Sequence, residues 1–142
     1  MTKQQQLTKV VHFFETVSPQ TINDITDLYE VNAYFKDPFN EVYGHEVIIA
    51  IFDHMFRQVA TPRFIIKQSF LQESEAFIIW DFEFCLNGKT AQHSIHGSSH
   101  IRFNSAGKVE YHRDYWDAAE ELYEKIPLLG SLMRFIKRRA RG

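Results

Sequence analysis

Three segments in the first half of the chain show the apolar spacing of amphipathic helices. In residues 7–17 apolar side chains recur three and four positions apart, which places them on one helical face. A second helix is predicted after Thr21, which would cap it, with an apolar stripe that ends at Tyr29. A short extended piece over residues 34–37 follows, and a third helix begins after Gly44 and ends near a Thr-Pro pair.

Beyond this point the apolar period changes from helical to alternating. Large apolar side chains alternate with Asp81, Glu83 and Cys85, which indicates a strand with one buried face. Asn87-Gly88 favours a hairpin turn after this strand, and residues 104–107 favour another. The pattern therefore predicts a four-stranded antiparallel meander, with strands over residues 64–71, 80–86, 91–103 and 109–116.

Helices followed by a meander indicate an α+β domain, in which N-terminal helices pack on one face of a strongly curved antiparallel sheet. The chain has 142 residues, of which 44% are hydrophobic and 15% aromatic, enough for one domain with its own core. We place this domain at residues 1–118 and assign residues 119–142 to a C-terminal amphipathic helical extension.

The extension differs from the rest of the chain in charge, although the formal net charge is only −2. All 18 acidic side chains precede residue 125, and the remaining residues carry basic side chains beside an apolar helical stripe. Such a basic helix could lie on anionic lipid, contact nucleic acid or pack on its own protein. We favour packing on the protein and expect no nucleic-acid partner; contact with a membrane surface is the less favoured alternative.

Cysteine content and the N-terminal sequence bear on the cellular compartment. Cys85 is the single cysteine, which excludes an internal disulfide and a cluster of thiolate metal ligands. The N-terminal residues lack the pattern of a secretory signal, and no apolar run approaches the roughly 18 residues of a membrane span. We therefore expect a cytoplasmic protein.

Three local motifs occur in an order known from one superfamily. Residues 34–39, Tyr-Phe-Lys-Asp-Pro-Phe, precede Gly44 and a helix; Asn87-Gly88 lies in the central hairpin; and residues 101–116 end in Tyr-Trp. Over about residues 5–118 the chain resembles the nuclear transport factor 2-like superfamily, which includes SnoaL-like polyketide cyclases and ketosteroid isomerases. The resemblance implies a cone-shaped sheet whose open end receives a small apolar molecule, with no cofactor, and a homodimer through the outer sheet face.

The resemblance also suggests site residues. Asp37 matches the general base of the ketosteroid isomerases, and Trp116 matches an aromatic residue beside that base. The enolate-stabilising Tyr and Asp of the isomerases correspond to Phe13 and Ser99 here. Because Phe13 cannot donate a hydrogen bond and Ser99 offers a single hydroxyl, steroid isomerisation is not expected.

Two further polar residues are predicted to join Asp37. His112 and Asp114 share a strand face with Trp116 by period two, so both are expected to point into the cone. A cluster of Asp37, His112 and Asp114 would suit acid/base catalysis, because a carboxylate can orient the imidazole while the other groups exchange protons. The expected pocket lining is mainly aromatic: Phe13, Phe35, Trp80, Phe82, Phe84, Ser99 and Trp116.

Each of these features also has a purely structural explanation. Asp37 before a proline could be a turn residue that accepts backbone hydrogen bonds. His112 and Asp114 could form a structural pair inside the fold or an ion pair on its surface. The functional hypotheses are accordingly an isomerase or cyclase, a non-catalytic binding protein, and a dimeric interaction module whose pocket is filled by its own side chains.

Histidines at positions 93, 96, 100 and 112 raise the question of a metal site. On a strand His96 and His100 share one face, opposite Ser99 and hence outside the cone. Two histidines without a third ligand make a weak site, so we predict no metal. The sequence also lacks a glycine-rich phosphate loop and a nucleophile elbow.

Overall fold

The structure is a computed structural model that describes residues 1–123. The predicted basic helix of the extension lies outside the described residues; the structure describes only the start of the extension, a π-helical turn, η2 (Ala119–Tyr123). In residues 1–123 no helix is long and apolar enough to cross a membrane.

Two long helices form where the apolar spacing predicted them. α1 (Lys3–Thr16) begins with a capping box between Thr2 and Gln5, and α3 (His45–Gln58) follows Gly44. The second predicted helix is shorter than expected and consists of η1 (Ile22–Asp24) and α2 (Ile25–Leu28). The predicted cap by Thr21 is wrong, since its side chain makes no cap hydrogen bond, and Tyr29 already starts a strand.

Six strands form one sheet in the order β2-β1-β6-β5-β4-β3. The predicted antiparallel meander is confirmed as β3 to β6, and two strands that the sequence did not reveal in full extend it. One of them, β1, pairs in parallel with β6, so the sheet is mixed. The strands are β1 (Tyr29–Lys36), β2 (Glu41–Tyr43), β3 (Val59–Gln72), β4 (Glu75–Leu86), β5 (Gln92–Phe103) and β6 (Val109–Tyr115).

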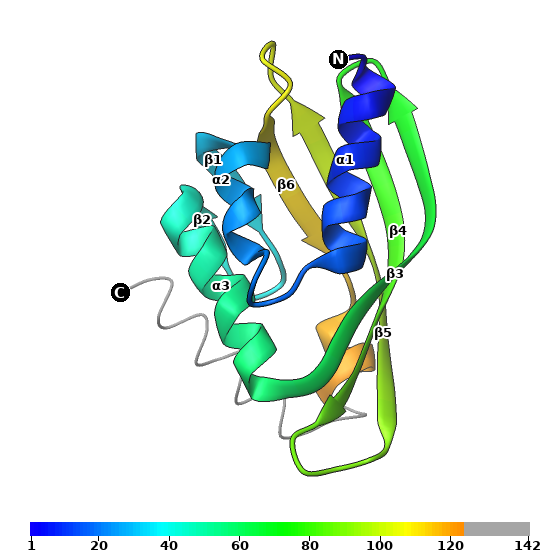
Figure 1. Ribbon diagram of the computed structural model, residues 1–142. Helices are drawn as coiled ribbons and strands as arrows, with labels where there is room; N and C mark the ends of the chain where they lie inside the picture. The colour runs from blue at the N-terminus through cyan, green and yellow to red at the C-terminus, as the bar shows by residue number, and fades with distance from the viewer. Residues whose placement is uncertain (124–142) are drawn as a thin grey trace.

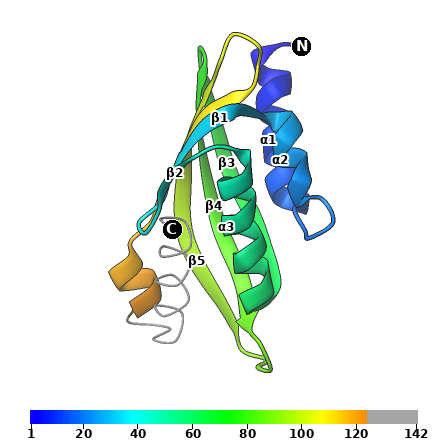
Figure 2. The ribbon, with the colours of Figure 1, turned by 90° about the vertical axis from the view of Figure 1, so that its left-hand side faces the viewer.

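Helices α1, α2 and α3 cover the same face of the curved sheet. Figure 1 shows these three helices in front of the strands, and the turned view in Figure 2 shows them on one side of the sheet and the short η2 on the other. The core lies between the two layers, and its buried side chains include Phe13, Phe35, Phe82 and Phe84. The predicted α+β class, with a curved sheet around N-terminal helices, is confirmed.

Both predicted turns of the meander are present. Residues 87–91 join β4 to β5, with Gly88 in the left-handed region at φ 79° and the Lys89 amide donating to the Leu86 carbonyl. Asn104 closes the next turn, where Gly107 has φ 80°. The turns therefore fix the register that brings β5 and β6 together below the helices.

Candidate functional site

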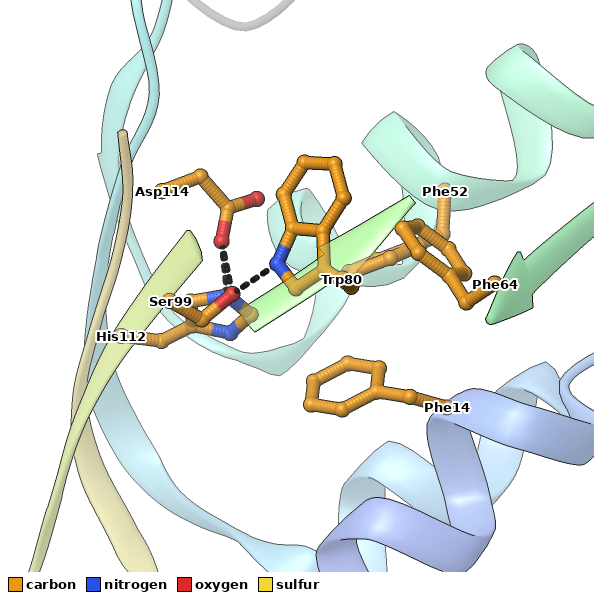
Figure 3. Close-up of a pocket in the computed structure, with 7 residues that line it drawn as sticks. All are labelled: Phe14, Phe52, Phe64, Trp80, Ser99, His112 and Asp114. Atoms are coloured by element: carbon orange, nitrogen blue, oxygen red, sulfur yellow. Dashed lines mark hydrogen bonds and ion pairs between the residues drawn. The ribbon is translucent and has the colours of Figure 1, made fainter. Parts of the chain in front are cut away.

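A small cavity lies between the helical layer and the inner face of the sheet. Its volume is about 10 Å³, which is the space that one water molecule needs. Four aromatic rings and three polar side chains surround it, and Figure 3 shows their arrangement. The lining consists of Phe14, Phe52, Phe64, Trp80, Ser99, His112 and Asp114.

Strand register brings the polar side chains of the lining together. Ser99 of β5 lies opposite Asp114 of β6, and His112 is two positions before Asp114, so all three point to the inner face. Trp80 reaches the same point from β4. The helices contribute only apolar groups, Phe14 from α1 and Phe52 from α3.

A continuous chain of hydrogen bonds links these polar groups. The Trp80 Nε1–H donates to Ser99 Oγ over 2.9 Å, and the Ser99 hydroxyl donates to Asp114 Oδ1 over 2.5 Å. His112 Nε2 lies 2.6 Å from the same Asp114 oxygen, and His112 Nδ1 lies 2.6 Å from the hydroxyl of Tyr29. The chain thus runs from the indole through the carboxylate and the imidazole to a tyrosine in the core.

Tyr29 determines the tautomer of His112. Burial, together with the negative charge of Asp114, raises the pKa of the Tyr29 phenol well above its usual value, so this hydroxyl keeps its proton. Its available acceptor is His112 Nδ1, which leaves the imidazole proton on Nε2, pointing at Asp114. An imidazole with a fixed orientation therefore holds one oxygen of the Asp114 carboxylate.

Asp37 is buried close to this chain but is not part of the cavity lining. Its Oδ1 accepts hydrogen bonds from the backbone amides of Phe39 and Asn40, at 2.8 and 2.7 Å, as expected for a turn residue. The Asn40 side-chain amide donates to both carboxyl oxygens, at 3.0 and 3.1 Å. Loss of solvent, with a smaller contribution from the charge of Asp114, raises the pKa of Asp37 to about 6 in spite of these hydrogen bonds.

The predicted cluster is thus assembled in two parts. His112 and Asp114 are in direct contact inside the fold, so the interpretation as a surface ion pair is wrong. Asp37 approaches Asp114 closely enough for the two charges to interact, although the structure shows no hydrogen bond between them. Asp37 therefore accepts the hydrogen bonds of the turn and also lies near Asp114.

The residues of the predicted aromatic lining lie in different places. Of the seven residues, Trp80 and Ser99 border the cavity, and the four phenylalanines belong to the packed core: Phe13, Phe35, Phe82 and Phe84. Phe13 also lines a separate pocket between α1 and α2. Trp116 lies against Phe39, with ring centroids 5.8 Å apart, beside the turn that holds Asp37. Along a strand the period fixes the inner face, but neighbouring layers decide which inward side chains meet a cavity.

Four important residues were missed from the sequence: Phe14, Phe52, Phe64 and Tyr29. Phe14 and Phe52 were recognised as members of apolar helical stripes, which is the pattern of any core-facing helix. Tyr29 was assigned to a helix, and so its meeting with His112, 83 positions further on, was not foreseen. The alternation that begins at Tyr29, with buried Ala33 and Phe35, was the available signal.

Of the other histidines in β5, His96 and His100 lie on the outer face as expected, while His93 lies on the inner side against Phe84, with ring centroids 5.6 Å apart. His96 Nδ1 is 2.5 Å from Asp81, and His100 Nε2 is 2.7 Å from Glu75, so these two histidines have separate partners. Among the residues that the structure describes, no group of three or more His, Cys, Asp or Glu side chains is placed to hold a metal ion.

Known structures share this fold at low sequence identity. A hypothetical protein with a ketosteroid isomerase-like fold from Catenulispora acidiphila, in complex with trimethylamine, is 12% identical, with a TM-score of 0.71 over 85% of this chain and 92% of that one. A putative SnoaL-like polyketide cyclase from Jannaschia is 11% identical, with a TM-score of 0.73 over 84% of this chain and 90% of that one. An LEH-like epoxide hydrolase from M. tuberculosis is 11% identical, with a TM-score of 0.71 over 91% of this chain and 95% of that one. These likenesses show the fold.

Sequence comparison is more specific about the family. No curated protein matches the chain significantly. The SnoaL-like domain family, however, matches residues 10–112, which include the second half of α1, the Asp37 turn, both cavity strands β4 and β5, and His112. Because this match covers well over half of the chain, the protein belongs to the SnoaL-like domain family.

Proposed function

We propose that the protein is a cofactor-independent enzyme of the isomerase or cyclase type, which transfers protons on a small, largely apolar molecule. The observation that carries this proposal is the position of Asp114 at the cavity wall. One of its oxygens is held by His112 and Ser99, and a second buried acid, Asp37, interacts with it. Two carboxyl groups in unlike surroundings are a common basis for acid/base catalysis.

The surroundings of the two acids suggest different roles. Asp114 accepts two short hydrogen bonds at Oδ1, which fixes the carboxylate while Oδ2 remains available to take a proton. The pKa of Asp37, at about 6, allows this group to release and recover a proton near neutral pH. His112 acts as a positioning residue, because its imidazole orients Asp114 from inside the core.

Similar structures support a small molecule as the substrate. The Jannaschia protein is described as a putative SnoaL-like polyketide cyclase and the M. tuberculosis protein as an LEH-like epoxide hydrolase. The four rings around the cavity would contact an apolar body, although side chains must move to admit one into a space of about 10 Å³.

The proposal is tested by finding a co-purified ligand and following its proton exchange. Native mass spectrometry would identify the ligand, and proton NMR in D₂O would measure deuterium incorporation and product formation. We expect Asp114→Asn and Asp37→Asn each to lower the rate by about 100-fold or more, the range of general acid/base contributions. The control is Asp81→Asn, which removes a carboxylate on the outer face that also contacts a histidine. Unchanged rates in both site variants would refute the proposal.

A second candidate function, a dimeric interaction module, is favoured by the aromatic side chains that nearly fill the interior. The outer sheet face supports it as well, because each strand contributes one ring to a continuous row. Adjacent ring centroids in the row are 5.1–6.4 Å apart from β2 to β4, and the last ring is paired by strand register. This outer aromatic row consists of Tyr43, Tyr34, Tyr111, His100, Phe77 and Phe70.

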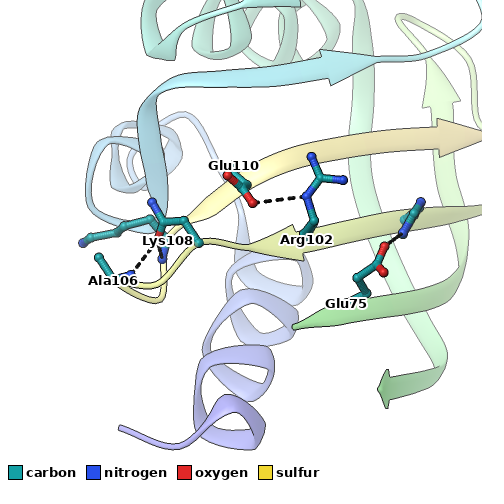
Figure 4. Close-up of polar contacts among 7 residues, drawn as sticks. Glu75, Arg102, Ala106, Lys108 and Glu110 are labelled. Carbon is teal, nitrogen blue, oxygen red and sulfur yellow. Dashed lines mark hydrogen bonds and ion pairs between the residues drawn. The ribbon is translucent and has the colours of Figure 1, made fainter. Parts of the chain in front are cut away.

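We propose that a second copy of the chain covers this row in a homodimer. Phe77 and Phe70 are 39% and 54% exposed, so apolar surface would be removed from water on association. Ion pairs flank the row, including Arg102 with Glu110 (Figure 4) and Glu75 with His100. Charges of both signs beside an apolar strip suit a self-complementary contact. Such a dimer is compatible with either function of the inner site.

A further inference from the structure

All side-chain hydrogen-bond donors around the cavity are already used within the protein. The indole N–H of Trp80 is bound to Ser99, and the hydroxyl of Ser99 is bound to Asp114. The Nε2–H of His112 is also directed at Asp114, and the phenol that contacts its other nitrogen points away into the core. The remaining lining residues are phenylalanines, which have no donor. The site therefore has no side-chain donor left for an oxyanion or an anionic substrate.

The polar atoms that remain are acceptors. Asp114 Oδ2 has no hydrogen-bond partner among residues 1–123, although the side chain borders the cavity. Asn40 Oδ1, next to Asp37, is also unpartnered, and Asn40 is only 4% exposed. A buried acceptor without a partner is unfavourable, so Asn40 Oδ1 would gain from a donor that a ligand supplies. Asp114 Oδ2 is not fully buried and can accept such a donor directly.

The charge of the site also favours a ligand that donates hydrogen bonds, and in particular a cation. Within the described part of the chain neither Asp37 nor Asp114 forms an ion pair with a lysine or an arginine; His112 is the partner of Asp114, and Asn40 is that of Asp37. Two carboxyl groups in low-dielectric surroundings thus have no lysine or arginine to compensate their charge. The faces of aromatic rings attract cations as well, and four rings line the cavity.

The available space sets the size of the group that can enter. About 10 Å³ admits one water-sized group, and a primary ammonium head, –NH₃⁺, has three donors and about the size of a water molecule. A trimethylated head has no N–H to donate to these acceptors. From these observations we infer that the site binds a primary organic ammonium ion, with its head against Asp114 and its apolar body toward the aromatic rings. This inference rests on the proposed function for the location of the site, and it names the class of substrate.

The inference is tested with three probes that share one apolar body: benzylammonium, benzyl alcohol and benzyltrimethylammonium. Binding to the full chain at pH 7.5 is measured by calorimetry, and the indole N–H signal of Trp80 is followed by NMR to locate the probe. We expect the Kd of benzylammonium to be at least tenfold lower than that of either other probe. In Asp114→Asn the preference over benzyl alcohol should fall below threefold.

Asp81→Asn is the matched control, because Asp81 forms a comparable hydrogen bond with His96 on the outer face. It should retain the full preference for benzylammonium. If Asp114→Asn does not fold, a second variant, Asn40→Ala, tests the same inference. It should weaken the binding of benzylammonium and leave the binding of benzyl alcohol constant. Equal affinity of the wild type for benzylammonium and benzyl alcohol, or a preference that survives Asp114→Asn in the folded protein, would overturn the inference.

The two proposals fail in different ways. If Asp37 and Asp114 are needed for proton transfer on a neutral substrate, the proposed enzymatic function stands and the ammonium ligand class is excluded. If the protein binds ammonium ions selectively but turns over no bound amine in D₂O, the ligand class stands and catalysis is excluded. The binding experiment alone therefore decides the class of ligand.

Discussion

The indole ring of Trp80 lies directly on the backbone of Gly97, its partner across the β4–β5 pair. A Cβ atom built on Gly97 would come within 2.4 Å of the ring carbon Cη2, far inside van der Waals contact. The absence of a side chain at Gly97 therefore lets the indole lie flat on the sheet, where its N–H reaches Ser99. This contact places the largest wall of the cavity.

Gly97→Ala is expected to displace Trp80 and lower stability. The added methyl group meets the rigid far end of the indole, and overpacking of this kind costs about 1–3 kcal/mol. The variant should show a lower denaturation midpoint in urea and a shifted NMR signal for the Trp80 indole N–H. Ser98→Ala, one position further along β5, is the control and should change neither. An unshifted indole signal in Gly97→Ala would contradict the packing described.

Tyr29→Phe is expected to leave His112 without a single fixed tautomer. The change removes the hydroxyl 2.6 Å from Nδ1 and leaves a buried acceptor unpaired, at a cost of about 1–3 kcal/mol. Nitrogen-15 NMR should show His112 protonated at Nε2 alone in the wild type, and a mixture of tautomers in the variant.

Tyr34→Phe is the matched control, because this hydroxyl bonds to Glu41 at the exposed surface. We expect a loss of less than about 1 kcal/mol for this exposed contact. If both variants lose the same free energy of unfolding, the buried hydrogen bond between Tyr29 and His112 stabilises the fold no more than the exposed one does.

Asp37 should make folding stability depend on pH. Its pKa rises from 3.8 to about 6 on folding, so the folded protein holds this proton more tightly than the unfolded chain. The resulting stabilisation is fully present below pH 3.8 and is lost as the pH rises through about 6. Asp37→Asn cannot ionise, so relative to the wild type it should gain up to about 3 kcal/mol between pH 3.5 and pH 8.

Urea unfolding at a series of pH values measures this difference. Asp53→Asn is the control, since Asp53 forms an ion pair with Arg57 on the surface of α3 and does not contact the site. A difference between wild type and Asp37→Asn that stays constant over the whole pH range would show that Asp37 ionises as freely in the folded protein as in the unfolded chain.

The proposed homodimer predicts an effect of charge in the outer aromatic row. Phe77→Lys places a cation in the middle of this row, where it would have to be desolvated on association. Sedimentation equilibrium should show a dimer for the wild type and at least a tenfold weaker dimer for the variant. Thr26→Lys, on the helical side of the molecule, should leave the association unchanged. A monomeric wild type at 100 µM would refute the dimer.

Local patterns in the sequence were enough for the element types and for the inward faces. Alternation along β4 and β6 placed Trp80, His112 and Asp114 on the inner side, and the asparagine and glycine turns set the meander between them. They were not enough for β1, since η1 and α2 end earlier than the apolar stripe suggested and the strand begins at Tyr29. Apolar stripes of helices and short strands cannot be separated by periodicity alone.

The sequence by itself determined the α+β order, the curved meander and the pairing of His112 and Asp114 on one face, because these depend on periods within single elements. Only the tertiary structure decided that Tyr29 meets His112, that Asp37 is buried beside Asp114 and that phenylalanines from α1, α3 and β3 nearly fill the interior. These contacts join segments far apart along the chain. They depend on the parallel register of β1 with β6 and on the packing of two layers, which no local period encodes.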